Sequence, residues 1–278
     1  MNVARTLAGS GLLTSLLIFA AGCGGTATET TKTDATPLTK EALFRRGHQF
    51  YLQQQHDSAQ SVLKSVLTMD ANYREAIADL AALHYDLAMR SEAGKPKAEQ
   101  LKESREYYVK LESLGSTDSD TYERLCEIAN ALSDSKTFLR YAKKNVDHYP
   151  FDRQYYNLSV ACFEANDYQG AIKAMKEAVE KFRNSSYIGS FYRQLGRAYT
   201  KVDRDQTAEK TFYTGLAAAD RMIADLKKRG GDYKSSPDYA RLKDDKIGML
   251  ASLKNLHTTY QAMDKLADVE KKLKELGR

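Results

Sequence analysis

The stretch Tyr192–Phe212, YRQLGRAYTKVDRDQTAEKTF, decides the fold class of this chain. Its apolar and aromatic side chains recur at three- and four-residue spacing, which is typical of amphipathic helices. Gly196 and Ala208 are small residues that lie 12 positions apart, each between bulkier neighbours. Small residues allow two helices to cross closely, while the bulky residues fill the space beside the crossing. The stretch therefore predicts a helical hairpin.

The same arrangement recurs along the chain from Lys40 onward. The small-residue position of a first helix and the helix-crossing position of the next helix lie 12 residues apart in five pairs: Gly47 and Ala59, Cys126 and Phe138, Ser159 and Ala171, Gly196 and Ala208, and His257 and Val269. A further pair, Ala81 and Ser104, fits if 11 residues are inserted near Gly94-Lys95-Pro96. The first members at positions 47 and 81 lie 34 residues apart, and those at 126 and 159 lie 33 apart. A fixed period of this length predicts an array of helical repeats.

This pattern resembles the tetratricopeptide repeat (TPR), in which a bulky residue precedes Leu-Gly, then Tyr, and later Ala-x3-Phe. The residues that carry the resemblance best are Tyr192, Leu195-Gly196, Tyr199, Ala208 and Phe212. The resemblance implies an all-α, right-handed superhelical TPR solenoid of about six helical hairpins. Each hairpin would bury its apolar face against its neighbours, and the first helices would line a concave groove.

The repeat boundaries follow from the spacing. We expect repeats at about 40–73, 74–118 with an insertion, 119–151, 152–188, 189–229 and 250–278. The surplus residues 230–249 predict a loop through Gly230-Gly231 to Pro237 and an extra helix from Asp238. The third repeat reverses the large and small residues at Phe138 and Ala142, so its packing is expected to differ.

Residues 1–22 have the pattern of an export signal. Arg5 is followed by an apolar stretch, Leu7 to Ala21, which is shorter than the ~20 predominantly apolar residues of a membrane-spanning helix. Ala20-Ala21-Gly22 precedes Cys23, and this resembles the lipobox of bacterial lipoproteins. The resemblance implies that Cys23 becomes the lipid-modified first residue of the mature protein. The alternative is ordinary secretion, in which Cys23 is incidental.

Residues 23–39 are expected to form the lipidated cysteine and a flexible, threonine-rich tether. In the lipoprotein family, aspartate after the cysteine favours retention in the inner membrane, and this chain has Gly24 instead. The resemblance therefore implies a lipid anchor in the outer membrane, facing the periplasm. Two or more acyl chains suffice for stable anchoring.

Charge and motif content exclude several function classes. The formal net charge of +5 falls to +4 once Arg5 is removed, which argues against nucleic acid as the main partner. No H-x-x-x-H pair and no C-x-x-C occurs, so we expect no metal and no cofactor. Ser61 and Lys64 match S-x-x-K by chance, because neither S-D-N nor K-T-G follows. We expect no catalytic residues, and a binding scaffold rather than an enzyme.

Cys126 and Cys162 occupy small-residue positions in neighbouring first helices. They are expected to act as small buried apolar side chains. A disulfide is the alternative if their Cα atoms come within ~7 Å in an oxidising compartment.

The TPR resemblance assigns certain first-helix positions to the groove. They are Phe44, His48, Tyr51 and Tyr85 in the first two repeats, Arg153, Tyr156 and Phe163 in the fourth, and Arg193, Arg197 and Lys201 in the fifth. The last three lie four residues apart and predict a basic stripe on one helical face. Such a face would suit an extended segment carrying carboxylates. The alternative is a solvated cationic face with tyrosines in the core.

The predicted function is that of a lipid-anchored TPR scaffold for protein–protein interaction, helping to assemble or stabilise a bacterial envelope complex. It resembles in outline the TPR lipoproteins of outer-membrane protein assembly and of type IV pilus secretin assembly. TPR domains that grip chaperone tails pair groove asparagines with lysine and arginine, and the sequence shows no matching asparagine. The alternative function is a periplasmic ligand- or peptide-binding module of a transporter, in which the loop at 230–237 closes over its ligand.

Overall fold

The computed structural model of this protein describes residues 39–277. The export signal, Cys23 and all but the last residue of the tether lie outside the described residues. The predictions made for them remain predictions.

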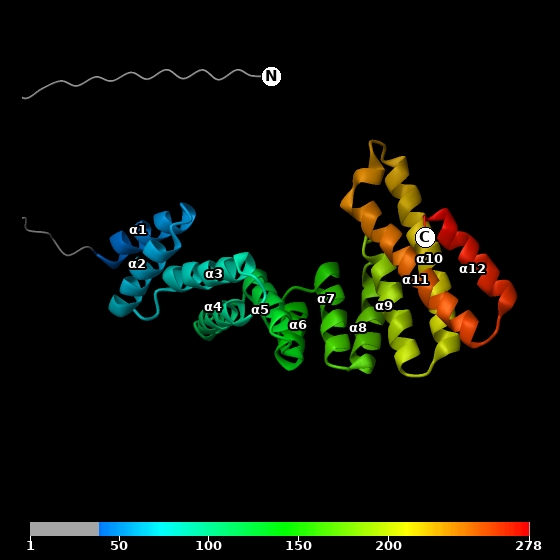
Figure 1. The fold of residues 1–278 in the computed structure, drawn as a ribbon, viewed down its shortest axis with the longest axis horizontal. Coiled ribbons are helices and arrows are strands. Elements are labelled where there is room, and N and C mark those ends of the chain that lie inside the picture. The colour runs from blue at the N-terminus through cyan, green and yellow to red at the C-terminus, as the bar shows by residue number, and fades with distance from the viewer. Residues whose placement is uncertain (1–38, 278) are drawn as a thin grey trace, which may run out of the picture. The chain divides into compact units, whose positions relative to one another are not determined.

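Residues 39–277 form twelve α-helices and one short 3-10 helix, with no β-strand among them (Figure 1). The helices are α1 (Lys40–Leu52), α2 (His56–Met69), α3 (Arg74–Arg90), α4 (Lys95–Ser113), α5 (Ser119–Ala131), α6 (Ser135–His148), α7 (Asp152–Glu164), α8 (Tyr168–Lys181), α9 (Ile188–Lys201), α10 (Asp205–Lys228), α11 (Pro237–Thr259) and α12 (Met263–Glu275). The 3-10 helix η1 spans Tyr233–Ser235. Consecutive helices pair into six hairpins, so the predicted all-α TPR solenoid is confirmed.

The hairpins stack in chain order. Each helix contacts the next, and first helices also contact first helices of neighbouring repeats: α1 meets α3, α7 meets α9, and α9 meets α11. Hydrogen bonds join the remaining neighbours, from Tyr85 in α3 to Glu127 in α5 and from Gln154 in α7 to Glu123 in α5. The first helices α1, α3, α5, α7, α9 and α11 therefore form one continuous face, called here the groove face.

The core runs through the whole stack as buried clusters that cross repeat boundaries. One cluster joins α1–α3, a second joins α3–α7, and a third extends from Val146 in α6 to Val269 in α12. Because every hairpin shares its apolar residues with its neighbours, no repeat has a core of its own.

Close helix crossing explains the small residues found in the sequence. A Cβ atom on Gly196 would lie 2.3 Å from Cε1 of Phe212, and one on Gly47 would lie 2.8 Å from Cδ2 of Leu63. Leu63 and Phe212 are fully buried. In the third repeat Phe138 and Ala142 are both buried despite their reversed sizes. The reversal is thus accommodated inside the core.

The region after the fifth repeat differs from the prediction. The expected separate helix before residue 250 does not occur, because α11 runs without a break from Pro237 to Thr259. Ser236 caps its first turn and Pro237 begins it. The added turns of α11 pack beside α10 and contact α9 through Asp245.

The register of the sixth hairpin also differs from the prediction. In four hairpins a residue with left-handed backbone lies seven positions after the small residue, at Gln54, Ser133, Asn166 and Asp203. In the sixth hairpin the left-handed residue is Gln261, only four positions after His257. The turn therefore places Lys254, and not His257, at the position equivalent to Gly196. His257 and Val269 are buried one helical turn further along.

Candidate functional site

The groove face carries two pockets that together hold half of the predicted binding residues. The N-terminal pocket, of about 440 Å³, is lined by Tyr51, Ala82, Tyr85, Asp86, Tyr108, Asp120, Glu123, Arg124, Glu127 and Arg153. The C-terminal pocket, of about 270 Å³, is lined by Arg197, Thr200, Lys201, Asp205, Phe212, Ser252, Asn255, Leu256 and Thr259. Of the predicted residues, Tyr51, Tyr85 and Arg153 fall in the first, and Arg197 and Lys201 in the second.

Tyrosine hydroxyls hold two carboxylates in the N-terminal pocket. The hydroxyl of Tyr51 donates to Asp86 at 3.0 Å, and that of Tyr85 donates to Glu127 at 2.9 Å. Burial and the neighbouring carboxylate raise the pKa of both phenols, so both remain neutral donors. Four carboxylates line this pocket beside two arginines, so its net charge is negative.

The two arginines of the N-terminal pocket are already bound. Arg124 lies over the ring of Tyr85, 4.5 Å from its centroid, and pairs with Glu127 at 2.7 Å. Arg153 pairs with Glu123 at 3.4 Å, and the side-chain amide of Gln154 donates to the same carboxylate. Arg153 is therefore on the groove face as expected, but its charge is offset by Glu123.

Phe44 and His48 line neither pocket. Their rings lie against each other with centroids 5.7 Å apart, and Phe44 also packs on Tyr73. Nδ1 of His48 lies 2.8 Å from a carboxylate oxygen of Asp79. Burial raises the pKa of Asp79, although the contact with His48 opposes the shift. The pair links α1 to α3.

Tyr156 and Phe163 also lie outside both pockets. Tyr156 packs against Tyr187 with ring centroids 5.8 Å apart. Phe163 is covered by the guanidinium of Arg197, 4.7 Å above its centroid. These aromatic side chains pack between α7 and the start and middle of α9, and they line neither groove pocket.

Arg193 forms an ion pair with a buried carboxylate of α11. Asp245 is only 3% exposed; it lies 3.3 Å from Arg193 and accepts a hydrogen bond of 2.5 Å from Ser190. Burial raises the pKa of Asp245, while Ser190 and Arg193 favour its ionised form and limit the shift. The predicted stripe of three cations is thus a structural ion pair followed by two cations at the C-terminal pocket.

Arg197 and Lys201 face an array of neutral polar groups across the C-terminal pocket. Asn255 and Thr259 of α11 stand opposite them, with Ser252 one turn earlier. The guanidinium of Arg197 donates to Gln194 at 2.8 Å, and Asp205 accepts from Tyr260 at 2.6 Å. Partial burial and the nearby Arg193 lower the pKa of Arg197. The pocket presents donors from two successive first helices.

Asn255 was missed because of the register of the sixth hairpin. With Lys254 at the position of Gly196, Asn255 corresponds to Arg197 and Thr259 corresponds to Lys201. The sequence of the turn could have revealed this register, because Gln261-Ala262-Met263-Asp264 resembles Gln54-Gln55-His56-Asp57 of the first hairpin. The expectation that the groove contains no asparagine beside its cations was wrong.

The carboxylates of the N-terminal pocket were also missed. Asp120, Glu123 and Glu127 follow one another at three- and four-residue spacing on α5, and Asp86 lies on α3. This spacing places the three α5 carboxylates on one face of the helix. In the sequence these carboxylates are indistinguishable from scattered, solvent-facing charges. They come together only because α3 and α5 lie side by side in the stack.

Cys126 and Cys162 are both buried and unpaired. Burial raises the pKa of the Cys126 thiol to about 12 and that of Cys162 to about 11. The two side chains serve as small core residues, and the structure contains no disulfide between them.

Among residues 39–277, no group of three or more histidine, cysteine, aspartate or glutamate side chains could hold a metal ion. Within the same residues, every helix is too short or too polar to cross a membrane.

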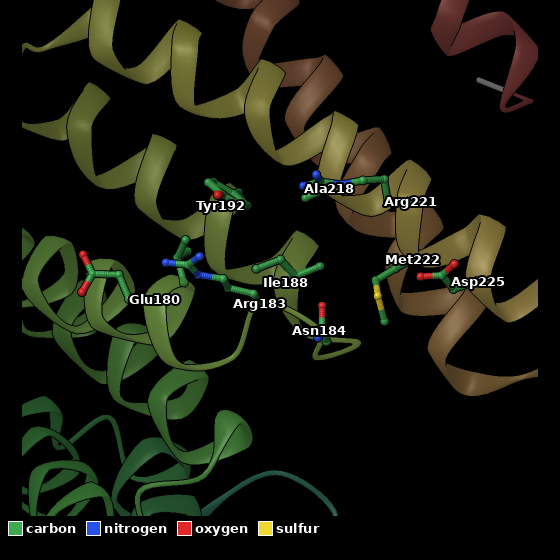
Figure 2. A pocket seen from close by; sticks show the side chains of 10 residues that line it. Glu180, Arg183, Asn184, Ile188, Tyr192, Ala218, Arg221, Met222 and Asp225 are labelled. Atoms are coloured by element: carbon green, nitrogen blue, oxygen red, sulfur yellow. The ribbon is translucent and has the colours of Figure 1, made fainter.

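A further hollow, of about 490 Å³, lies away from the groove face, between the second helices α8 and α10. Figure 2 shows Glu180 and Arg183 on one side of it, and Arg221, Met222 and Asp225 from α10 on the other. Its rim carries two arginines and two acidic residues, so the charges balance. None of the predicted binding residues lines it.

No protein-family model and no curated protein matches this chain. Solved structures do resemble it. The MamA protein is 17% identical over 66% of this chain and 92% of its own, with a TM-score of 0.51. YrrB, described as a TPR protein with an unusual peptide-binding site, is 13% identical over 70% of this chain and 94% of its own, with a TM-score of 0.52. At these identities the likeness shows the fold: the chain has the TPR fold.

Proposed function

We propose that this protein is a polypeptide-binding scaffold that holds an extended, carboxylate-bearing segment in its C-terminal pocket. The observation that carries the proposal is the convergence of Arg197 and Lys201 from α9 with Asn255 from α11. A guanidinium binds a carboxylate through two parallel hydrogen bonds, and an amide side chain can bond the peptide backbone beside it. YrrB is described as having a peptide-binding site, which supports a peptide as the ligand of this fold.

We propose further that the scaffold is anchored in the outer membrane by lipid on Cys23, facing the periplasm. The lipobox resemblance at Ala20-Ala21-Gly22-Cys23 supports the anchor, and Gly24 supports the outer membrane. In this setting the bound segment belongs to an envelope protein, and the scaffold helps to assemble or stabilise the complex that contains it.

The transporter-module alternative is not favoured by a specific contact. It required the loop at 230–237 to close over a ligand, but residues 230–236 line neither groove pocket. Tyr233 of this loop instead packs edge-on against Tyr239 of α11, with ring centroids 5.5 Å apart.

The proposal is tested by crosslinking in living cells, followed by purification of the protein from solubilised membranes. The test variant is Arg197→Glu/Lys201→Glu. Arg193 is left intact because its replacement would leave the buried carboxylate of Asp245 without its ion-pair partner. The matched control is Arg183→Glu/Arg221→Glu, which makes the same charge change in the hollow between α8 and α10.

We expect one envelope protein to be captured in equal amount by the wild type and the control, and to be lost from the test variant. A synthetic glutamate-rich peptide should bind the purified protein with the same dependence on Arg197 and Lys201. Equal capture by test variant and control would exclude the C-terminal pocket as the contact. Absence of any captured protein would refute the scaffold function.

A further inference from the structure

The N-terminal pocket holds more negative charge than its own arginines neutralise. Arg124 is paired with Glu127, and Arg153 with Glu123. Among residues 39–277, no cation pairs with Asp86 or Asp120, the other two carboxylates of this pocket. Within the same residues, the one hydrogen bond that Asp86 accepts comes from the hydroxyl of Tyr51. Two negative charges are therefore available to a ligand.

A buried phenol without a partner points into the same pocket. Tyr108 is 8% exposed and lines the N-terminal pocket, yet its hydroxyl bonds to no side chain or backbone group of the described residues. Burial raises the pKa of Tyr108 to about 12, and the charges that act on it come from Arg124, Asp86 and Glu127. All three line the pocket. The hydroxyl oxygen is not one of the fully buried polar atoms that lack a partner, so it opens into the pocket, where a ligand group can bond to it.

Tyr51, Tyr85 and Tyr108 add aromatic ring faces to the carboxylates of this pocket, and both kinds of group attract cations. Arg124 already lies over Tyr85 at 4.5 Å, which shows that a ring face in this pocket accepts a guanidinium. Tyr51 and Tyr108 add further aromatic surface. A volume of about 440 Å³ is within the ordinary range of ligand pockets. Aromatic walls with unpaired carboxylates suit a lysine or arginine side chain.

We propose that the N-terminal pocket binds a basic polypeptide segment, with one lysine or arginine side chain placed between Tyr51, Tyr108 and Asp86. The inference extends the proposed function to a second class of segment on the same groove face. A polypeptide is the occupant because the pocket opens on the stacked first helices, along which an extended chain can run. Charge complementarity with Asp86 and Asp120 selects a basic sequence.

The test measures the fluorescence anisotropy of a labelled peptide of alternating lysine and alanine on addition of the purified protein. The variant is Asp86→Asn/Asp120→Asn, which removes the two unpaired charges but leaves an acceptor for the hydroxyl of Tyr51. The matched control is Glu180→Gln/Asp225→Asn, which removes two charges from the hollow between α8 and α10. Circular dichroism confirms that both variants keep their helices.

We expect the affinity for the basic peptide to fall about tenfold in the pocket variant and less than twofold in the control. An equal loss in both variants would overturn the inference, because the peptide would then respond only to total charge. Spermine bound in an Asp86-dependent manner, with no binding of the peptide, would overturn the assignment of a polypeptide.

A second arm separates this inference from the proposed function. The Arg197→Glu/Lys201→Glu variant should lose the glutamate-rich peptide and keep the lysine-alanine peptide. If the wild type binds only the basic peptide, the carboxylate site of the C-terminal pocket is wrong and the inference stands. If it binds only the acidic peptide, the inference is wrong and the proposed function stands.

Discussion

The two pockets lie on the same stack of first helices, but they differ in which of their charged side chains are paired. In the N-terminal pocket both arginines are paired with glutamates, and the surplus charge is carboxylate. At the C-terminal end the carboxylate of Asp245 is buried and bound to Arg193, so the surplus at the pocket is cationic. The sign of each pocket is therefore the charge that remains after ion pairs form within α5, between α5 and α7, and between α9 and α11.

This difference also separates structural from available charge. Asp245 is sealed between α9 and α11 and accepts bonds from two side chains. Asp86 stands half-buried at a pocket wall and accepts one. We expect replacement of the first to affect mainly folding and replacement of the second to affect mainly binding.

The largest expected effect is on stability, from Asp245→Ala. It leaves the hydroxyl of Ser190 without its acceptor and removes the counter-charge of Arg193, which is itself partly exposed. We expect the free energy of unfolding to fall by about 2–3 kcal/mol in urea denaturation followed by circular dichroism.

The comparison variant is Asp86→Ala in the N-terminal pocket. It removes one hydrogen bond from a half-buried carboxylate, so we expect a loss of at most about 1 kcal/mol. Equal losses in the two variants would refute the distinction between structural and available charge.

The sequence alone does not distinguish structural from available charge. The 12-residue spacing and the Leu195-Gly196 motif predicted the hairpins, because close helix crossing constrains residue size directly. Charge pairing between first helices carries no comparable local pattern. Arg193 looked equivalent to Arg197, and only the added turns of α11 bring Asp245 against it.

The groove prediction failed most clearly where the repeat was irregular. His257 and Val269 fit the 12-residue rule, and both are buried, yet the turn lies one helical turn earlier. An apolar pattern repeats with every helical turn, so a shift of three residues leaves it nearly unchanged. The polar groove position moved with the turn, and Asn255 was overlooked.

A smaller effect, on affinity alone, is expected from Tyr108→Phe. The hydroxyl of Tyr108 bonds to no other described residue, so its removal should change the free energy of unfolding by less than about 0.5 kcal/mol. A ligand that bonds this hydroxyl should lose about threefold to tenfold in affinity, as measured by anisotropy with the basic peptide.

Tyr51→Phe is the control for this change. Its hydroxyl already donates to Asp86, and its removal frees that carboxylate for the ligand cation. We expect it to weaken binding less than Tyr108→Phe does. Unchanged affinity in Tyr108→Phe would place the ligand away from that phenol.

The smallest effect concerns pH, and it is isolated by Asp245→Asn. Burial raises the pKa of Asp245 above its unfolded value, so the folded state holds the proton more tightly than the unfolded state. The stability that this proton contributes is complete below the ordinary aspartate pKa of about 3.9 and is lost as pH rises through the raised pKa. Asparagine keeps an acceptor for Ser190 and does not titrate.

The free energy of unfolding of the wild type, minus that of Asp245→Asn, should therefore fall as pH rises through this interval. Taking the difference cancels the other carboxylates, such as Glu209, whose pKa is lowered by Lys265 and which contribute with the opposite sign. The effect is small because Ser190 and Arg193 oppose the burial of the charge. A difference that rises with pH would mean that Arg193 outweighs burial, and that the charged pair itself stabilises the contact between α9 and α11.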